Sequence, residues 1–174
     1  KNMMELIKQM KFIGETGESS IQSGLGILDI DHAISDSFNH PHFPKDHFGH
    51  PLAANLLPWI DVPVEFGMSK EEWKGMTETN KILNTKNLIP IDGTCVRIGA
   101  MRSHSQALTI KLNKNIPIDE VNNMIDEANQ WVSLIENDRE KTLHNLTPSK
   151  VSGTLNIPIG RVRKMRMGDT YLNA

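Results

Sequence analysis

The chain has 174 residues, with 19 Lys and Arg against 21 Asp and Glu, a formal net charge of −2 and one cysteine. This length fits one domain with a hydrophobic core, the single cysteine excludes an internal disulfide framework, and the charge balance argues against binding to nucleic acid. No apolar run reaches the roughly 20 residues of a membrane span and no signal peptide opens the chain, so we expect a cytoplasmic protein.

Apolar spacing predicts the elements of the first half of the chain. In chain order these are a helix over 2–13, a Gly/Ser/Thr-rich stretch over 14–26, a short helix over 27–34, a His- and Pro-rich loop over 37–51, a strand over 52–60 and a helix over 69–84. The last helix has the clearest start, because Ser69 and Glu72 form a capping box in which each side chain reaches the backbone of the other residue.

The second half of the chain mixes strands and helices without a strict βαβ order. The expected segments are strands over 95–98 and 106–112, a helix over 118–130, a strand over 131–135, a short helix over 147–151 with proline at its first position, and one or two strands within 154–167. With neither repeats nor a linker, residues 1–174 are expected to form one domain. The predicted fold class is α+β with a mixed, largely antiparallel sheet.

Histidines gather in one loop and are the first candidates for chemistry. The cluster comprises His32, His40, His42, His47 and His50. Imidazoles at such close spacings can ligate zinc or nickel, with Asp46 as an oxygen donor. The alternative is a polar surface loop, which is favoured because the spacings match no closed zinc pattern.

Cys95 and the segment that follows it offer a second set of reactive groups. A catalytic thiol needs a base or a positive neighbour, whereas a cysteine within a strand is more often a small buried core residue. Arg97 has the planar fork that suits a carboxylate, and His104 can move a proton near neutral pH. The alternative for this pair is an arginine at a strand rim and a histidine held by a turn.

The polar face of the helix over 69–84 carries a row of charges. Glu71 and Lys74 lie three residues apart near the positive end of the helix dipole, and Glu78 and Lys81 continue the row. Such rows are usually solvated surface pairs. Glu72 is engaged by the capping box, which leaves Glu71 freer to meet a ligand. The chain has neither a Gly-x-Gly-x-x-Gly fingerprint nor a P-loop nor a Gly-x-Ser-x-Gly elbow.

The segment 91–105, Ile-Asp-Gly-Thr-Cys-Val-Arg-Ile-Gly-Ala-Met-Arg-Ser-His-Ser, resembles the signature segment of aspartate-semialdehyde dehydrogenase. Other stretches resemble the Gram-negative bacterial branch of the same family and occur in the family's order. These stretches are 51–53, 58–61, 71–75, 78–83, 137–140, 146–148 and 160–164. The resemblance implies an α+β fold like the C-terminal domain of glyceraldehyde-3-phosphate dehydrogenase, with helices packed on one face of the sheet.

The resemblance also implies an activity. The complete enzyme is an NADP-dependent homodimer that interconverts L-4-aspartyl phosphate and L-aspartate 4-semialdehyde plus phosphate. In the oxidative direction a cysteine thiolate attacks the aldehyde, hydride passes to NADP, and phosphate cleaves the thioester. The cell runs the reduction, which feeds lysine, threonine, methionine and diaminopimelate synthesis.

Four residues match functional positions of the family. The resemblance implies that His104 is the general acid/base, that Arg97 binds the α-carboxylate of the substrate, that Glu71 holds its amino group and that Lys74 helps to bind phosphate. Cys95 matches a position that is not the nucleophile.

The resemblance covers one part of the family's enzyme. We expect residues 1–174 to be its substrate-binding and dimerisation domain, with the NADP-binding domain and the nucleophilic cysteine upstream of Lys1 and the final helix beyond Ala174. The 174 residues alone are therefore predicted to lack dehydrogenase activity. A non-catalytic assembly module of the same fold and a metal-binding histidine loop are the alternatives.

Overall fold

The computed structural model describes residues 2–100 and 102–174, which form two compact units. The first unit comprises the chain up to Leu56 together with the segment 98–102, and the second comprises 57–97 and 103–174. Lys1, the expected boundary with a preceding domain, and Met101, within the signature segment, lie outside the described residues.

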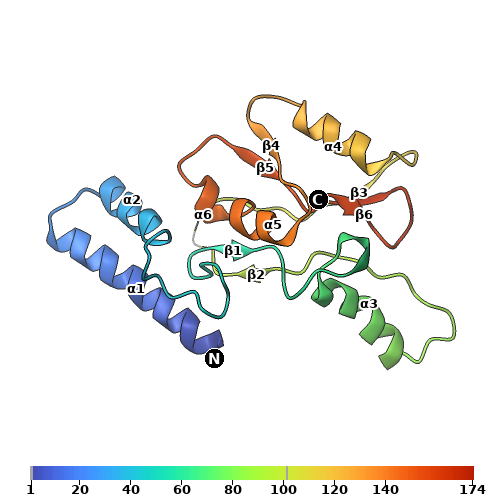
Figure 1. The fold of residues 1–174 in the computed structure, drawn as a ribbon, viewed down its shortest axis with the longest axis horizontal. Helices are drawn as coiled ribbons and strands as arrows, with labels where there is room; N and C mark the ends of the chain where they lie inside the picture. The colour runs from blue at the N-terminus through green and yellow to red at the C-terminus, as the bar shows by residue number, and fades with distance from the viewer. Residues whose placement is uncertain (1, 101) are drawn as a thin grey trace. The chain divides into compact units, whose positions relative to one another are not determined.

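Two helices, α1 (Asn2–Gln22) and α2 (Ile27–Ser37), pack against each other in the first unit (Figure 1). The prediction that the first helix ends at residue 13 is wrong, because the helix continues through the Gly/Ser/Thr-rich stretch. The hydroxyl of Thr16 donates to the Phe12 carbonyl oxygen at 2.9 Å, so this polar side chain bonds within the helix instead of ending it. At Gly17 the missing side chain admits Ile34, whose Cδ1 would lie 3.4 Å from a Cβ there.

The strand predicted over 52–60 is reduced to β1 (Leu56–Leu57). Its first residues turn towards α1, where Gln9 Oε1 accepts hydrogen bonds from the backbone N–H groups of Leu52 and Ala53 at 2.9 Å each. Gly99 lies against the same turn, and a Cβ on it would stand 2.4 Å from the Leu52 carbonyl oxygen. The backbone N–H groups that a longer strand would have paired with a neighbouring strand are therefore bound by Gln9 at this turn.

Within residues 2–100 and 102–174 the strands form three small sheets rather than one. Their pairing is mixed and largely antiparallel, as predicted, so the α+β fold class is confirmed. The sheets are β1 with β2 (Arg97–Ile98); β3 (Thr109–Lys111), β7 (Tyr171–Asn173) and β6 (Arg163–Lys164), antiparallel in the order β3-β7-β6; and β4 (Val132–Leu134) with β5 (Ile157–Ile159), parallel. In the three-stranded sheet Ile110 lies opposite Leu172.

The second unit has its core between α4 (Ile118–Asp126) and the strands. Val121 of α4 packs with Val162 and Leu172, and partly buried residues surround these three. The surrounding residues are Leu112, Ile116, Ile118, Ile125, Leu134, Ile159 and Ala174. In Figure 1, α4 lies beside β4 and the chain end lies near β3 and β6. The amphipathic spacing that predicts α4 thus identifies the face that meets the core, although the helix ends at residue 126 rather than 130.

The second unit also contains further helical elements. They are the 3₁₀ turn Glu65–Gly67, α3 (Lys70–Ile82), α5 (Arg139–Asn145) and α6 (Pro148–Val151). Proline stands at the start of α6 as predicted. Sequence reasoning missed α5, which begins at Asp138, whose side chain accepts from the Lys141 backbone N–H at 2.9 Å. Among the helices of 2–100 and 102–174, none combines the length and apolar character needed to cross a membrane.

Candidate functional site

The first turns of α3 present a charged pair to solvent. The predicted capping box at Ser69 is confirmed, and it fixes the start of the helix so that Glu71 and Lys74 lie on one face. Lys74 Nζ donates to Glu71 Oε1 at 2.8 Å, and both side chains are a little over one-third exposed. The hydrogen bond and the negative charge of Glu71 raise the pKa of Lys74. Two opposite charges that remain reachable by solvent can bind a small zwitterion or an anion.

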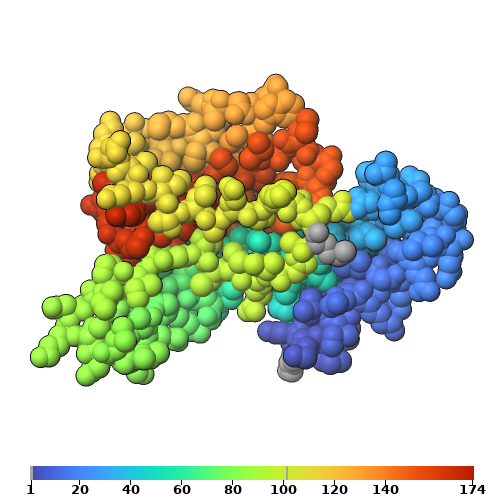
Figure 2. All heavy atoms as spheres, turned by 180° about the vertical axis from the view of Figure 1, so that it is seen from behind, coloured from blue at the N-terminus to red at the C-terminus, as the bar shows by residue number. Residues whose placement is uncertain are grey.

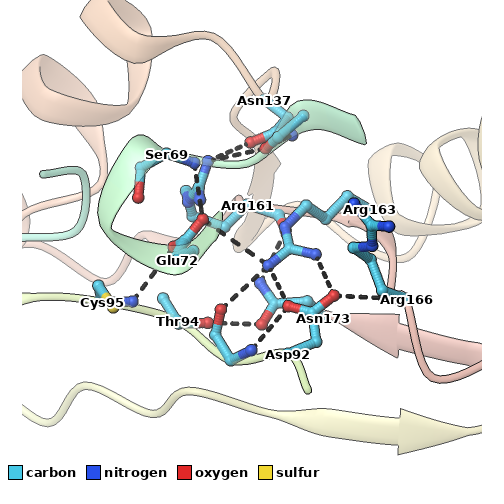
Figure 3. A network of polar contacts seen from close by, with 12 residues as sticks. Ser69, Glu72, Asp92, Thr94, Cys95, Asn137, Arg161, Arg163, Arg166 and Asn173 are labelled. Carbon is cyan, nitrogen blue, oxygen red and sulfur yellow. Dashed lines mark hydrogen bonds and ion pairs between the residues drawn. The ribbon is translucent and has the colours of Figure 1, made fainter. Parts of the chain in front are cut away.

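Directly behind this pair, the Glu72 side chain is buried and joins three parts of the chain (Figure 3). Its Oε2 accepts from the backbone N–H of Ser69 at 2.8 Å, and its Oε1 accepts from the backbone N–H of Cys95 at 3.2 Å. Arg161 Nη2 also donates to Oε2 at 2.5 Å. The capping residue of α3 is therefore also the carboxylate of an internal ion pair.

Arg161 is the positive partner of Glu72 and only 1 % of its surface is exposed. Its Nη1 donates to Asn137 Oδ1 at 2.7 Å, and its guanidinium lies 3.9 Å from the centre of the Trp59 ring. Burial lowers the pKa of Arg161, and the neighbouring charge of Glu72 only partly opposes that shift. Its φ of +59° is rare for a residue with a side chain, so its backbone is held by these contacts.

A second buried pair, Arg163 with Asp92, adjoins the first. The two guanidinium nitrogens of Arg163 donate to Asp92 at 2.7 and 2.9 Å, and the Arg166 backbone N–H donates to the same carboxylate at 2.8 Å. Burial by itself raises the pKa of Asp92, but the hydrogen bonds from Arg163 and Arg166 outweigh burial and lower it overall. Arg163 Nη2 also lies 3.7 Å from Glu72 Oε2, so two cations and two anions form one neutral network.

The end of the chain closes this network. Thr94 Oγ1 donates to Asn173 Oδ1 at 2.5 Å, and Asn173 Nδ2 donates to the carbonyl oxygen of Arg161 at 3.0 Å. The segment 92–95, the strand β7 and the residues before β6 are thereby joined by side-chain hydrogen bonds (Figure 3).

Cys95 is half-buried and precedes β2 instead of lying within a strand, because its backbone N–H is taken by Glu72. The predicted strand over 95–98 is therefore wrong in its first half, and Cys95 is not a core residue. Burial and then the negative charges of Glu72 and Glu71 raise the pKa of its thiol. A thiol of raised pKa holds little thiolate at neutral pH and is a weak nucleophile.

Arg97 and His104 both lie on the surface. Arg97 is the first residue of β2, and His104 belongs to the exposed stretch 102–110, the yellow segment on the face shown in Figure 2. No hydrogen bond or ion pair joins His104 to Glu71 or Lys74 within the described chain. The structure thus brings Glu71 and Lys74 together, while Arg97 and His104 stand on separate exposed segments.

The buried network was not anticipated from the sequence beyond the capping role of Glu72. One signal was present: Arg161 and Arg163 flank Val162, and alternate residues of an extended strand point to opposite faces. Val162 lies in the core, while Arg161 and Arg163 both reach the buried carboxylate of Glu72, although the left-handed φ of Arg161 departs from an extended strand. Buried arginines require carboxylates, but which acidic residues supply them depends on segments more than 65 positions away in the chain.

The histidine loop does not assemble a metal site in the described part of the chain, where no three His, Cys, Asp or Glu side chains come together. His40 instead packs its ring against those of Phe12 and His42, each with a centroid separation of 5.5 Å. The metal-binding alternative therefore has no geometry to support it.

Comparison with known proteins gives a family over the whole chain. The family described as semialdehyde dehydrogenase, dimerisation domain, matches residues 1–174. Aspartate semialdehyde dehydrogenase from Francisella tularensis is 41% identical, with a TM-score of 0.51, over 98% of this chain and 46% of that chain.

Two further solved structures are more distant. Aspartate semialdehyde dehydrogenase II from Vibrio cholerae is 26% identical with a TM-score of 0.35, over 82% of this chain and 43% of that one. A probable aspartate-semialdehyde dehydrogenase from Pseudomonas aeruginosa is 15% identical with a TM-score of 0.34, over 94% and 42%. The chain spans less than half the length of each of these three proteins.

Proposed function

This chain belongs to the semialdehyde dehydrogenase dimerisation-domain family, and from that premise we propose that it is the substrate-binding and dimerisation domain of an aspartate-semialdehyde dehydrogenase. The proposed reaction is the reversible, NADPH-dependent reduction of L-4-aspartyl phosphate to L-aspartate 4-semialdehyde and phosphate. The protein is proposed to act as a homodimer in lysine, threonine, methionine and diaminopimelate synthesis. The 41% identity to the Francisella tularensis enzyme over 98% of this chain supports the assignment.

The observation that carries the proposal is the Glu71–Lys74 pair. Both side chains are partly exposed at the start of α3, where the helix dipole favours an approaching anion. Glu71 is proposed to accept hydrogen bonds from the ammonium group of the substrate. Lys74 is proposed to attract phosphate as a flexible point charge.

Arg97 and His104 are proposed to complete the substrate site. A guanidinium binds a carboxylate through two parallel hydrogen bonds, which suits Arg97 for the α-carboxylate. His104 is proposed as the general acid/base, which exchanges a proton with the oxygen of the reacting carbonyl. Both residues are exposed.

The cofactor and the nucleophile do not fit the residues of this chain. The sequence has no glycine-rich dinucleotide fingerprint, and its one thiol has a raised pKa. NADP and the attacking cysteine are therefore proposed to belong to a part of the enzyme outside these 174 residues. The 174 residues alone are expected to show no dehydrogenase activity.

The test is phosphate-dependent oxidation of aspartate semialdehyde by the full-length protein, followed through the absorbance of NADPH. In Lys74→Met the KM for phosphate should rise about tenfold or more, because a hydrogen bond to a charged group contributes roughly 1.5–3 kcal/mol. Lys81→Met, which removes an exposed charge from the last turn of the same helix, is the matched control and should leave that KM unchanged.

Two outcomes would contradict the proposal. An inactive full-length protein would favour the non-catalytic assembly module instead. An active protein with the same KM for phosphate in the Lys74 and Lys81 variants would keep the enzyme but remove Lys74 from its substrate site.

A further inference from the structure

We propose that Glu72 and Arg161 are positioning residues: the Glu72 carboxylate ties the first turn of α3 to the segment that leads into Arg97, and Arg161 holds that carboxylate in place. The inference rests on the proposed function, since it concerns how Glu71, Lys74 and Arg97 are held for the same substrate. Neither residue is proposed to touch the substrate itself.

The first step of the argument is that one carboxylate receives two backbone N–H groups from different segments. Ser69 N–H lies two residues before Glu71, and Cys95 N–H lies two residues before Arg97. Each oxygen of Glu72 takes one of these hydrogen bonds, so the rotation of the carboxylate fixes both segments together. The backbone segments that carry Glu71 and Arg97, which are proposed to bind the two ends of the substrate, are thus both held by the Glu72 carboxylate.

The second step is that Arg161 leaves Glu72 little freedom to move. Its guanidinium is bound on one side by Glu72 Oε2 at 2.5 Å and on another by Asn137 Oδ1 at 2.7 Å. Asn137 Nδ2 in turn donates to the Gly67 carbonyl oxygen at 2.9 Å, two residues before Ser69. The Trp59 ring covers the guanidinium at 3.9 Å and blocks water from that side.

The third step is that capping alone does not explain these contacts. A capping glutamate needs only the N–H of its N-cap residue, and glutamate is almost never fully buried unless it is paired. Glu72 is 3 % exposed and carries two further partners, Cys95 and Arg161, which a simple cap does not require. Burying an ion pair is costly, so its retention next to charged surface residues favours a role in geometry.

The test compares Glu72→Gln with wild type in the full-length protein. Glutamine has the same shape but cannot accept from Ser69, Cys95 and Arg161 together. We expect the KM for aspartate semialdehyde and for phosphate to rise and kcat/KM to fall about 100-fold, because displacements near 1 Å at a substrate site have effects of this size. The KM for NADP should not change.

A second measurement does not depend on turnover. Amide hydrogen exchange at Ser69 and at Cys95 should become faster together in Glu72→Gln, and also in Arg161→Lys, which keeps the charge but loses the fork. If Glu72→Gln does not fold, the double variant Glu72→Gln/Arg161→Gln leaves neither partner charged and carries the same test. Glu120→Gln, an exposed acid in the first turn of α4, is the control and should match wild type.

Several results would overturn the inference. A lower kcat with unchanged KM values would mean that Glu72 only helps the protein to fold, and faster exchange at Ser69 without Cys95 would reduce it to a helix cap. An active wild type with a normal Glu72→Gln variant would contradict the inference alone. An inactive wild type would contradict the proposed function and the inference with it.

Discussion

Replacing Asp92 by asparagine tests the buried network through stability rather than activity. The change keeps the shape of the side chain but removes the negative charge that Arg163 contacts at 2.7 and 2.9 Å. Arg163 is 4 % exposed and would be left without its main counter-ion. Breaking a buried pair in this way costs about 3–5 kcal/mol.

The expected loss lies at the lower end of that range, about 3 kcal/mol, since Glu72 remains 3.7 Å from Arg163 in the variant. Urea denaturation followed by tryptophan fluorescence measures this loss. All three tryptophans, Trp59, Trp73 and Trp131, lie in the unit that contains the network. Asp119→Asn, at an exposed position in the first turn of α4, is the control and should change stability by less than about 0.5 kcal/mol.

The pair of Asp92 and Arg163 should also affect how the free energy of unfolding depends on pH. The folded protein lowers the pKa of Asp92, so its contribution is fully present above the ordinary value of about 3.9 and is lost as the pH falls through the lowered value. The stability difference between wild type and Asp92→Asn should therefore be constant near neutral pH and shrink below about pH 4. A loss under about 1 kcal/mol at pH 7, the size of an exposed ion pair, would refute the reasoning.

Two further predictions concern Gly99 and Cys95. Gly99→Ala should lower the free energy of unfolding by about 1–3 kcal/mol in thermal denaturation, because the new Cβ would stand 2.4 Å from the Leu52 carbonyl oxygen. Gly75→Ala on α3, where a Cβ meets open space, is the control and should not destabilise the protein. Equal effects of the two substitutions would contradict a steric clash at Gly99. Cys95 should react with iodoacetamide more slowly than free cysteine at pH 7.5, because burial and then the charges of Glu72 and Glu71 raise the pKa of its thiol. Its reaction rate should still be increasing at pH values above the ordinary pKa of a thiol. A rate that levels off near pH 7 would contradict this prediction.

Local signals predicted the helices better than the strands. The start of α3 follows from Ser69 and Glu72, because the capping box acts within four residues. The end of α1 does not follow from composition, since hydroxyl groups that usually favour turns bond back to their own helix. The strand expected after residue 52 is lost because Gln9, more than 40 residues earlier, takes its backbone N–H groups.

The candidate site likewise combines local contacts, which could be predicted from the sequence, with long-range contacts, which could not. The Glu71–Lys74 contact is a local i,i+3 pair and could be predicted from spacing. The partners of Glu72 could not, because Arg161 is 89 positions away and no local pattern specifies which acid a buried arginine meets. The surface positions of Arg97 and His104 likewise depend on the length of β2. The alternation of residues 95–98 predicts a longer strand than the structure contains.

The long sequence separation within the Glu72–Arg161 pair has a consequence for protein synthesis. When a ribosome adds 5–20 residues each second, Arg161 follows Glu72 by roughly 4–18 s. During that interval Glu72 has its helix cap but lacks its positive partner, and Asn173, which fixes the Arg161 carbonyl oxygen, arrives later still. The first turn of α3 is therefore synthesised well before its buried ion pair can form, so the growing chain carries Glu72 without its positive partner until Arg161 has been added.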